Sequence, residues 1–420
     1  MESDTSTESR RPRLWVISEL YYPEETSTGY YLTRIAEGLA DDFAVKVICG
    51  QPNYSKRGVV APSFEVRRGV EIHRAAGTTL NKNVILFRLL NMLTLGLSTL
   101  LKALRLFRKG DRVLVVTNPP TMPFIIAIAS LLRGGAYTLL VHDNYPEILV
   151  AAGKTGPNSL FARSMDFFNR WLYKHAERII AVGRDMRQLL EVKTEGLGIP
   201  VEAIPNWAEL ETVEPRPRSE NELLAELGLS DKFVLLYAGN MGYPNDLESI
   251  VDAADGLRDE CGIHFIFLGA GVKRPWLEKE ISRRNLPNIT IVDQRPRSDQ
   301  PIFLSACDVA IVSLVDKMWG VSVPSRTYNA LAAGKPLLGI VEPGSEVDLV
   351  IKEERIGWTV PPGRADQLEA EIRGIVSDRG QLGAMSKRAR TTATSKYSFD
   401  AAIGKYRAAL ITGDNGLIKH

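Results

Sequence analysis

The 420-residue sequence predicts an α/β protein of two Rossmann-like domains whose parallel sheets face each other across a cleft. Short apolar runs of strand length alternate with helix-forming segments, which is typical of parallel sheets covered on both faces. The alternation stops in a polar, acidic and proline-containing segment at residues 205–231, and it then restarts. The length also suits two domains better than one hydrophobic core.

Each half of the chain supplies the strands of one sheet. In the first half, strands are expected at residues 13–20, 43–50, 112–117, 137–142 and 178–183, with a helix around residues 33–40. In the second half, strands are expected at residues 233–239, 263–271, 289–293, 309–314 and 336–341, with a helix at 246–257. We therefore place a disordered polar tail at residues 1–12, the first domain at 13–208 and the second at 209–398.

The composition is that of a soluble globular protein, with 45% hydrophobic and 24% charged residues. Three widely separated cysteines form no CxxC pair, so neither a disulfide framework nor a zinc site is expected, and a reducing compartment is indicated. The first residues lack the apolar core of a signal peptide. Nucleic-acid binding is not expected, because the basic excess lies in one strip without interleaved aromatic residues.

That basic strip is the most unusual part of the first half. Residues 54–112 carry 12 Lys and Arg against three Asp and Glu, and residues 89–101 within them are uncharged and largely apolar. A run of 13 residues is too short for a bilayer core, which needs about 20. It is expected either to lie in an anionic membrane interface or to form a buried helix with a solvated basic end. The flanking cations are Arg88, Lys102, Arg105, Arg108 and Lys109.

Ligands of such sheets bind beyond the carboxyl ends of the strands, and polar residues follow the first-half strands there. The first strand leads into a hydroxyl-rich loop ending at Gly29, which could meet an anion or a sugar hydroxyl. The strand at 137–142 ends in His142 and Asp143, which could be an acid/base pair, partners for sugar hydroxyls, or structural residues.

Second-half strands end in glycine turns with nearby cations. Asn240 lies between two glycines, and Gly269 and Gly271 precede Lys273, whose ammonium could meet a diphosphate. The full dinucleotide motif is missing, so no nicotinamide and no other cofactor is expected. Arg295 follows the strand at 289–293 and could form a wall of the same pocket.

Residues 320–336 read as a turn, a short helix and a helix stop. Ser325 is expected to cap the helix and leave the N–H groups of Arg326 and the next two residues free for a phosphate. Gly334 should end the helix in a left-handed turn, and an ordinary connection between helix and strand would need the same residue. Together with the glycine turns, the segment indicates a site for a nucleotide-sugar diphosphate.

These segments resemble glycosyltransferase family 4, most of all the bacterial enzymes of O-antigen, colanic-acid and capsular polysaccharide synthesis. The resemblance covers about residues 13–410. It implies the GT-B fold, a C-terminal domain that holds the donor, metal-independent transfer with retention of configuration, and a last helix at residues 399–420 that returns to the first domain. The motifs that carry it are YYPEETSTG, VHD, IPNW, YAGNMG, LGAGVK, QRPRSD, ACDVAIVSL, VPSRTYNALAAGKP and GWTVPPG.

The resemblance also implies a role for each matching residue. Gly29, Asn240 and Lys273 would lie at the donor diphosphate, next to the turn of Gly269 and Gly271 that the residues themselves indicate. Arg295 would wall the base, Ser325 and Arg326 would begin the helix at the pyrophosphate, and His142 would lie beside the transferred sugar. The candidate catalytic residues are therefore His142, Asp143 and Lys273.

The chain departs from the family at two positions. Where the family commonly has two glutamates eight residues apart, it has Val321 and Asn329. Asn329 can still hydrogen-bond ribose hydroxyls, but Val321 cannot replace a carboxylate, and Asp316 could do so only if its loop were displaced.

The expected function is therefore retaining, metal-independent transfer of a hexosyl or N-acetylhexosaminyl group from a UDP-linked donor. The acceptor would be a lipid-linked saccharide at the inner face of the plasma membrane, where the basic strip would dock a cytoplasmic enzyme. Two alternatives stay open at this point: a nucleotide-sugar 2-epimerase on the same fold, and a non-catalytic subunit of a polysaccharide assembly complex.

Overall fold

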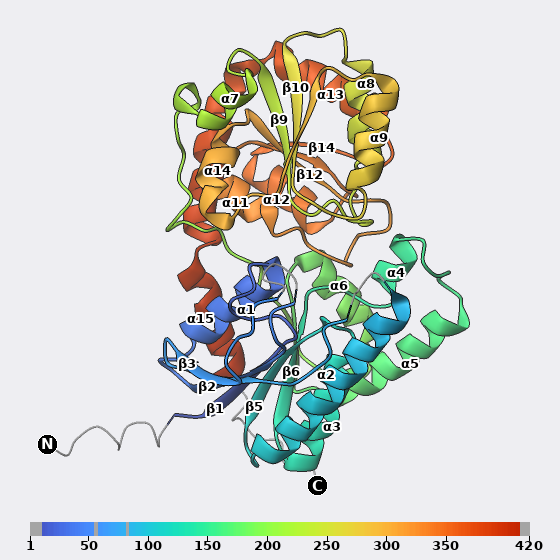
Figure 1. Cartoon of the computed structure of the whole chain (residues 1–420), viewed down its shortest axis with the longest axis vertical. Helices are drawn as coiled ribbons and strands as arrows, with labels where there is room; N and C mark the ends of the chain where they lie inside the picture. Colours follow the sequence, from blue (N-terminus) through green and yellow to red (C-terminus); the bar gives the residue numbers. More distant parts are fainter. Residues whose placement is uncertain (1–10, 54–57, 81–83, 412–420) are drawn as a thin grey trace, which may run out of the picture.

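The computed structural model describes residues 11–53, 58–80 and 84–411. Two α/β domains are stacked along the long axis of the molecule, and the chain passes between them in a linker and again between its last two helices (Figure 1). Most of the predicted tail and the last nine residues of the predicted final helix lie outside the described residues.

The first domain is built on an eight-stranded sheet in the order β3-β4-β2-β1-β5-β6-β7-β8. All neighbouring strands are parallel except β3, which pairs antiparallel with β4 at one edge. The strands are β1 (Arg13–Ile17), β2 (Ala44–Cys49), β3 (Phe64–Arg67), β4 (Val70–Arg74), β5 (Arg112–Val116), β6 (Ala136–Val141), β7 (Arg178–Ala181) and β8 (Val201–Ala203).

Helices cover both faces of this sheet. Three of them, α2, α3 and α5, lie side by side on the face that points toward the viewer in Figure 1. The helices of the domain are α1 (Ser27–Gly38), α2 (Ile85–Leu106), α3 (Met122–Arg133), α4 (Glu147–Ala151), α5 (Leu160–His175) and α6 (Arg184–Lys193).

The second domain has a fully parallel six-stranded sheet in the order β11-β10-β9-β12-β13-β14. Its strands are β9 (Phe233–Ala238), β10 (Ile263–Leu268), β11 (Ile289–Val292), β12 (Val309–Ser313), β13 (Leu337–Ile340) and β14 (Gly357–Val360). Its helices are α7 (Glu222–Leu227), α8 (Glu248–Gly256), α9 (Arg274–Arg284), α10 (Gln300–Ser305), α11 (Arg326–Ala332), α12 (Glu346–Glu354), α13 (Ala365–Ser377) and α14 (Leu382–Lys396).

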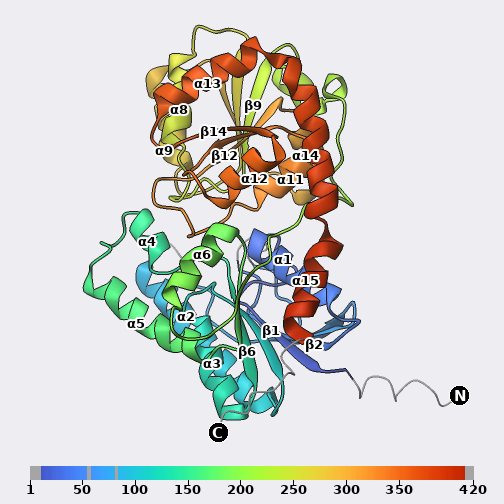
Figure 2. The same cartoon turned by 180° about the vertical axis from the view of Figure 1, so that it is seen from behind.

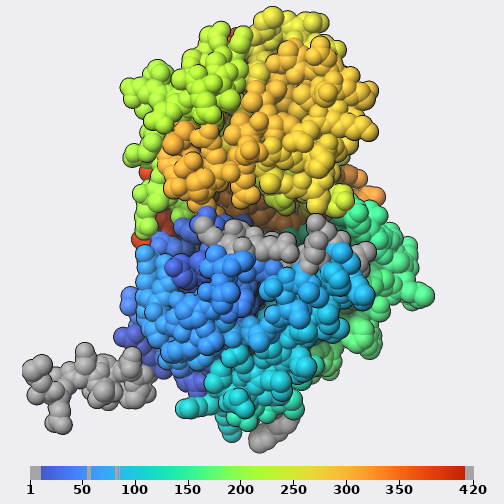
Figure 3. All heavy atoms as spheres, viewed as in Figure 1, coloured from blue at the N-terminus to red at the C-terminus, as the bar shows by residue number. Residues whose placement is uncertain are grey.

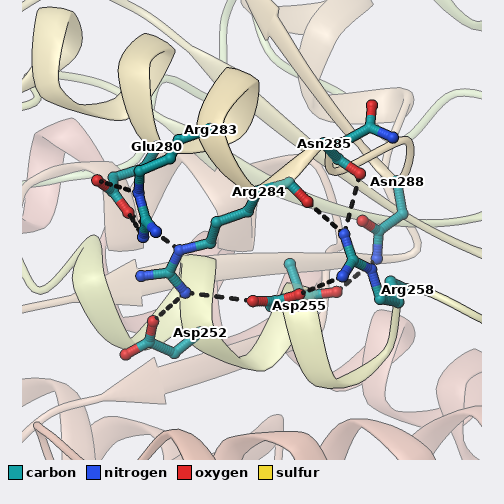
Figure 4. A network of polar contacts seen from close by, with 9 residues as sticks. Asp252, Asp255, Arg258, Glu280, Arg283, Arg284, Asn285 and Asn288 are labelled. Carbon is teal, nitrogen blue, oxygen red and sulfur yellow. Dashed lines mark hydrogen bonds and ion pairs between the residues drawn. The ribbon is translucent and has the colours of Figure 1, made fainter.

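A cluster of charges fixes α9 against α8 (Figure 4). The Arg284 guanidinium lies 2.6 Å from a carboxylate oxygen of Asp252 and 3.0 Å from one of Glu280. Arg258, which follows α8, pairs with Asp255 at 3.3 Å. Several charges that share partners hold a position better than isolated surface pairs do. The network therefore holds the C-terminal end of α9 against α8.

The chain crosses between the domains twice. Trp207 belongs to the core of the first domain, whereas Ala208 and Val213 belong to the core of the second. After α14 the chain returns through α15 (Phe399–Ile411), whose Ile403 and Tyr406 are buried in the first core (Figure 2).

The apolar strip of the first domain lies in α2, and this helix is longer than the sequence suggested. It has 22 residues, and the segment Leu86–Leu106 is long and apolar enough to cross a membrane by length and composition. The expectation that the run is too short for a bilayer was therefore wrong, because the helix continues through Lys102 and Arg105. However, Leu95 and Ala103 of α2 are built into the core of the first domain. We therefore treat α2 as a surface helix of this domain.

Candidate functional site

The carboxyl ends of the two sheets meet between the domains. After β6, the Asn144 N–H donates to the carbonyl of Val321 at 2.9 Å, and its side-chain amide donates to the carbonyl of Gly320 at 2.6 Å. At the start of α1, the Ser27 hydroxyl lies 2.8 Å from that of Ser325. In the space-filling view the second domain accordingly rests directly on the first (Figure 3). The structure thus brings the predicted site loops of both halves into one region.

Two glycine turns of the second domain are joined through their backbones. The N–H of Gly239 donates to the carbonyl of Leu268, and the N–H of Met241 donates to that of Ala270. A Cβ atom on Gly269 would lie 2.1 Å from the Gly239 oxygen, and one on Gly271 would lie 2.4 Å from the Met241 oxygen. Both glycines also have φ values of +142° and +155°, which other residues rarely adopt. Only glycine fits here, and the predicted turns form one continuous surface beside Asn240.

The two predicted cations of this region have different surroundings. The Lys273 ammonium lies 2.8 Å from the Asn245 carbonyl and 2.8 Å from a Glu248 carboxylate oxygen. The Arg326 guanidinium donates through Nη2 to Asn245 at 3.1 Å and lies over the Tyr237 ring, 4.5 Å from its centroid. Its Nη1 is buried and has no hydrogen-bond partner among the described residues. Arg326 is therefore the better placed of the two to donate to a ligand oxygen.

The predicted capping of α11 was wrong in its details. Ser325 has helical φ and ψ angles, and its hydroxyl makes no capping hydrogen bond but contacts Ser27 instead. The N–H groups of Thr327 and Tyr328 donate to the carbonyls of Pro324 and Ser325 in a tight first turn, so they are not free for a phosphate. Gly334 does have a left-handed backbone, with φ of 63°.

A buried carboxylate lies beside the position where the family would have its second glutamate. The backbone N–H of Glu209, in the linker, donates to Oδ1 of Asn329 at 3.2 Å. Glu209 is 6% exposed, and its Oε2 accepts a hydrogen bond from the Tyr30 hydroxyl at 2.5 Å. Its Oε1 lies 3.7 Å from Nη2 of Arg297, and that guanidinium stacks on the Tyr30 ring. Burial raises the pKa of this carboxyl, although the Tyr30 hydrogen bond and Arg297 oppose the shift.

Sequence reasoning missed this cluster, which joins the first domain, the linker and the second domain. Arg297 could have been suspected because it lies two residues after Arg295 in the same loop. Tyr30 and Glu209 carry no comparable signal, because only the fold brings them together. The predicted Arg295 instead points to α7, where it pairs with Glu226 at 3.2 Å.

His142 and Asp143 lie at the meeting point of the domains. Their backbone N–H groups both face the Thr117 hydroxyl, at 3.2 and 3.4 Å, and Asp143 forms an isolated antiparallel bridge with Ser322. Nε2 of His142 is buried and has no hydrogen-bond partner among the described residues. Burial lowers the pKa of this imidazole to about 4 and raises that of the Asp143 carboxyl. His142 is thus neutral near pH 7, with one ring nitrogen available to a ligand.

Comparison with known proteins decides the family. Residues 27–207 match the glycosyl transferase 4-like domain, and residues 219–392 match glycosyl transferases group 1. WbjE of Pseudomonas aeruginosa, which is named as a glycosyltransferase, is 30% identical over 400 residues that cover 95% of this chain and 97% of its own. The chain is a glycosyltransferase.

A second relative and two solved structures extend the comparison. WcaI of Escherichia coli K12, named for colanic acid biosynthesis, is 27% identical over 372 residues, covering 84% of this glycosyltransferase and 89% of its own chain. Sucrose-phosphate synthase from Thermosynechococcus elongatus superposes with a TM-score of 0.75 at 15% identity, covering 95% and 98% of the two chains. HepE from Anabaena, in complex with UDP-glucose, gives 0.67 at 15% identity, covering 95% and 100%. These likenesses confirm the predicted GT-B fold.

Of the remaining predicted residues of the glycosyltransferase, Gly29 directly precedes Tyr30 of the Glu209 cluster, whereas the membrane residues do not belong to that cluster. Gly29 is buried in the first turn of α1, where its N–H donates to the Thr26 hydroxyl at 3.3 Å. The predicted membrane residues lie along α2 and just after it, with Lys102 half-buried and the others exposed: Arg88, Lys102, Arg105, Arg108 and Lys109. Among the described residues, no group of three or more His, Cys, Asp or Glu side chains is placed to hold a metal ion.

A cavity of about 350 Å³ opens between the domains of the glycosyltransferase, next to the paired segments at Asn144 and Val321. The first domain lines it with residues of α4 and α5, including Glu147, Val150 and Asp166. The second domain lines it with Lys317, Trp319 and Val321. The site therefore has two parts, the glycine turns near Arg326 and this separate cavity toward α5.

Proposed function

We propose that this glycosyltransferase transfers a hexosyl or N-acetylhexosaminyl group from a UDP-linked donor to a lipid-linked saccharide, with retention of configuration and without a metal ion. The pathway would be cell-surface polysaccharide synthesis, as the name of WcaI says of that relative. The enzyme would act in the cytoplasm, at the inner face of the plasma membrane.

One observation carries the donor side of this proposal: the free Nη1 of Arg326 beside the glycine turns at Gly239 and Gly269. A guanidinium hydrogen-bonds phosphate oxygens well, and glycine turns allow a diphosphate to approach the backbone closely. Asn240 lies on the same turn and can add an amide donor. HepE holds UDP-glucose in the same fold, and we extend that donor class to this chain.

The reaction would begin with cleavage of the bond between C1 of the sugar and the diphosphate oxygen, which keeps the electron pair. Arg326, assisted by Lys273, would stabilise the negative charge that develops on this leaving group. The acceptor hydroxyl would form the new C1–O bond on the same face of the sugar, and its proton would pass to the departing phosphate oxygen. Neutral His142 would hydrogen-bond the sugar and orient it. Contact between the domains would exclude water, which otherwise hydrolyses the donor.

The acceptor side rests on the first domain. Three cations of α2 and two just after it, together with the long apolar face of this helix, fit a surface that is both apolar and anionic, as the inner leaflet is. We therefore propose that α2 docks the enzyme on the membrane that carries its lipid-linked acceptor.

Nucleotide binding tests the donor site. We expect UDP to raise the melting temperature of the wild-type protein, and GDP and ADP to do so less. Arg326→Ala should weaken UDP binding by about 10-fold or more, because it removes a charged donor. Arg283→Ala, on the exposed side of α9, is the matched control and should bind as the wild type does. Equal UDP affinity in the two variants would contradict the donor site.

Co-sedimentation with anionic vesicles tests the docking. Reversal of charge at Arg105, Arg108 and Lys109 should weaken membrane binding and so reduce the bound fraction. The binding free energy should become less favourable by roughly 1 kcal/mol for each cation lost. A control with three reversals on the second domain, at Lys279, Arg283 and Lys387, should bind normally, since these cations lie on the other domain. If the first variant binds anionic vesicles as well as the wild type, α2 does not dock the enzyme.

A further inference from the structure

Among the described residues, most of the exposed large apolar side chains lie on one helical layer of the first domain. Fifteen of 25 belong to α2, α3 and α5, although these helices are a small part of the chain. α2 contacts α3 and α3 contacts α5, so the three helices form one continuous surface, on the front of the lower domain in Figure 1 and Figure 3. Patches of this kind mark interaction sites in soluble proteins.

α5 contributes the aromatic part of this surface. Phe167 is 73% exposed and Phe168 is 56% exposed, and Phe161 lies about two turns before them and Trp171 about one turn after them. The opposite side of the helix packs against the domain, where Ala162, Asn169, Leu172 and Tyr173 are buried. α5 therefore presents its aromatic side chains outward, whereas a surface helix ordinarily turns its apolar stripe toward the core.

Cations border the aromatic side chains of α5. Arg163, Arg170 and Lys174 are exposed on the same helix, and the acidic Asp166 is already paired with Lys193 at 3.2 Å. Aromatic rings among arginines and lysines suit the interface of an anionic bilayer, where rings enter the acyl boundary and cations meet phosphates. A second copy of the chain fits less well, because a two-fold contact would bring the same cations face to face.

The interdomain cavity adjoins this surface. The first domain lines the cavity with Pro157, just before α5, Asp166, within it, and Val150 of α4. On the other side the cavity reaches Val321, whose carbonyl accepts from Asn144, two residues after His142. A saccharide attached to a lipid beside α5 would thus have a direct path to the meeting point of the domains.

We propose that the aromatic face of α5 is a second bilayer contact beside α2, and that the lipid-linked acceptor reaches the cleft through the cavity between α4, α5 and the segment at Val321. The partner is an anionic lipid surface. The proposal rests on the function proposed above, since it names the route by which that acceptor enters.

Vesicle binding by full-length variants tests the bilayer contact. The double variant Phe167→Ser and Phe168→Ser should bind vesicles of phosphatidylglycerol and phosphatidylethanolamine about 10-fold or more weakly, because two exposed rings no longer enter the interface. The control is Val192→Ser and Ile411→Ser, two exposed apolar residues of α6 and α15, which lie outside this surface and the donor site and should leave vesicle binding unchanged. Both variants should keep the wild-type melting temperature and UDP affinity.

Unchanged vesicle binding by the α5 variant would overturn the contact. So would a wild-type dimer in light scattering that the α5 variant converts to a monomer without change in vesicle binding, since the face would then be a subunit interface.

A cavity-filling variant tests the route. Val150→Trp should keep UDP and vesicle binding but lower transfer to the lipid-linked acceptor at least 10-fold, while slow hydrolysis of the donor continues. Unchanged transfer in this variant would overturn the route alone. If the wild type bound no nucleotide, the proposed function itself would fail, whatever the vesicle results.

Discussion

The ion pair between Arg184 and Glu346 offers a direct test of how the domains are held together. Arg184 begins α6 in the first domain, and Glu346 begins α12 in the second. Oε2 of Glu346 accepts from the Arg184 backbone N–H at 2.8 Å and from its Nε at 2.9 Å, and the same guanidinium pairs with Glu353 at 2.8 Å. The Glu346 side chain is only 5% exposed, so its charge depends on these partners.

Arg184→Ala removes the guanidinium but keeps the backbone hydrogen bond to Glu346. Loss of one partner of a fully buried pair costs about 3–5 kcal/mol. Because Arg184 is 34% exposed and the backbone donor remains, we expect about 2 kcal/mol. For domains of this size the melting temperature should then fall by roughly 4–8 °C in calorimetry.

The same helix supplies the control, and pH supplies a second arm. Arg187→Ala breaks only a half-exposed pair with Glu191 at 3.4 Å, so its effect should stay below about 1 kcal/mol. Burial raises the pKa of Glu346, and without Arg184 it should rise further. The stability linked to a raised carboxyl pKa is present at low pH and lost as the pH rises through that pKa. The deficit of Arg184→Ala should therefore shrink toward acidic pH; equal stability of the two variants at neutral pH would refute this account of the contact.

Three further predictions concern the site. Gly269→Ala should lower the melting temperature and weaken UDP binding, because its Cβ would lie 2.1 Å from the Gly239 oxygen. The control Gly262→Ala, just before the same strand and with no atom near its Cβ, should change neither, and similar behaviour of both variants would contradict the packing of the turns. A double-mutant cycle of Tyr30→Phe and Glu209→Gln should give a coupling of about 1–2 kcal/mol in unfolding experiments, whereas additive effects would show that this hydrogen bond does not form. Burial lowers the His142 pKa from 6.5 to about 4, so the stability of the wild type should fall as the pH drops through this window, and this fall should be smaller in His142→Asn. If the melting temperatures of the two proteins fell equally with pH, the imidazole would be exposed and not buried.

The strands were predictable because they are buried on both faces and so appear as uninterrupted apolar runs. β9, β10 and β12 lie where the runs at 233–239, 263–271 and 309–314 predict them. The edge hairpin of β3 and β4 was missed, because Phe64–Arg67 alternates exposed and half-buried residues and has no such run. The length of α2 was underestimated for a related reason: charges interrupt the apolar pattern at Lys102 and Arg105, but the helix continues through them.

The site was predictable only where function follows from local backbone geometry. The glycine turns at Gly239, Gly269 and Gly271 have the positive φ values that glycine permits, and that preference is visible in the sequence. The capping role of Ser325 was predicted from residue type alone, and the Ser27 hydroxyl of the other domain engages it instead. The contacts of Glu209 with Tyr30, Arg297 and Asn329 join parts of the chain separated by 88 to 179 positions, so no local pattern could indicate them.

Transfer of labelled sugar tests the central claim most directly. UDP-sugars labelled in the sugar would be incubated with the enzyme and extracted lipid-linked saccharides, and the label in the lipid phase would be measured for the wild type, Arg326→Ala and Arg283→Ala. We predict that one donor labels the lipid phase with the wild type and Arg283→Ala but at least 10-fold less with Arg326→Ala, and that the anomeric configuration of the donor is retained. Absence of transfer from every nucleotide-sugar tried, in a protein that binds neither UDP nor its sugars, would contradict the account and favour a non-catalytic role.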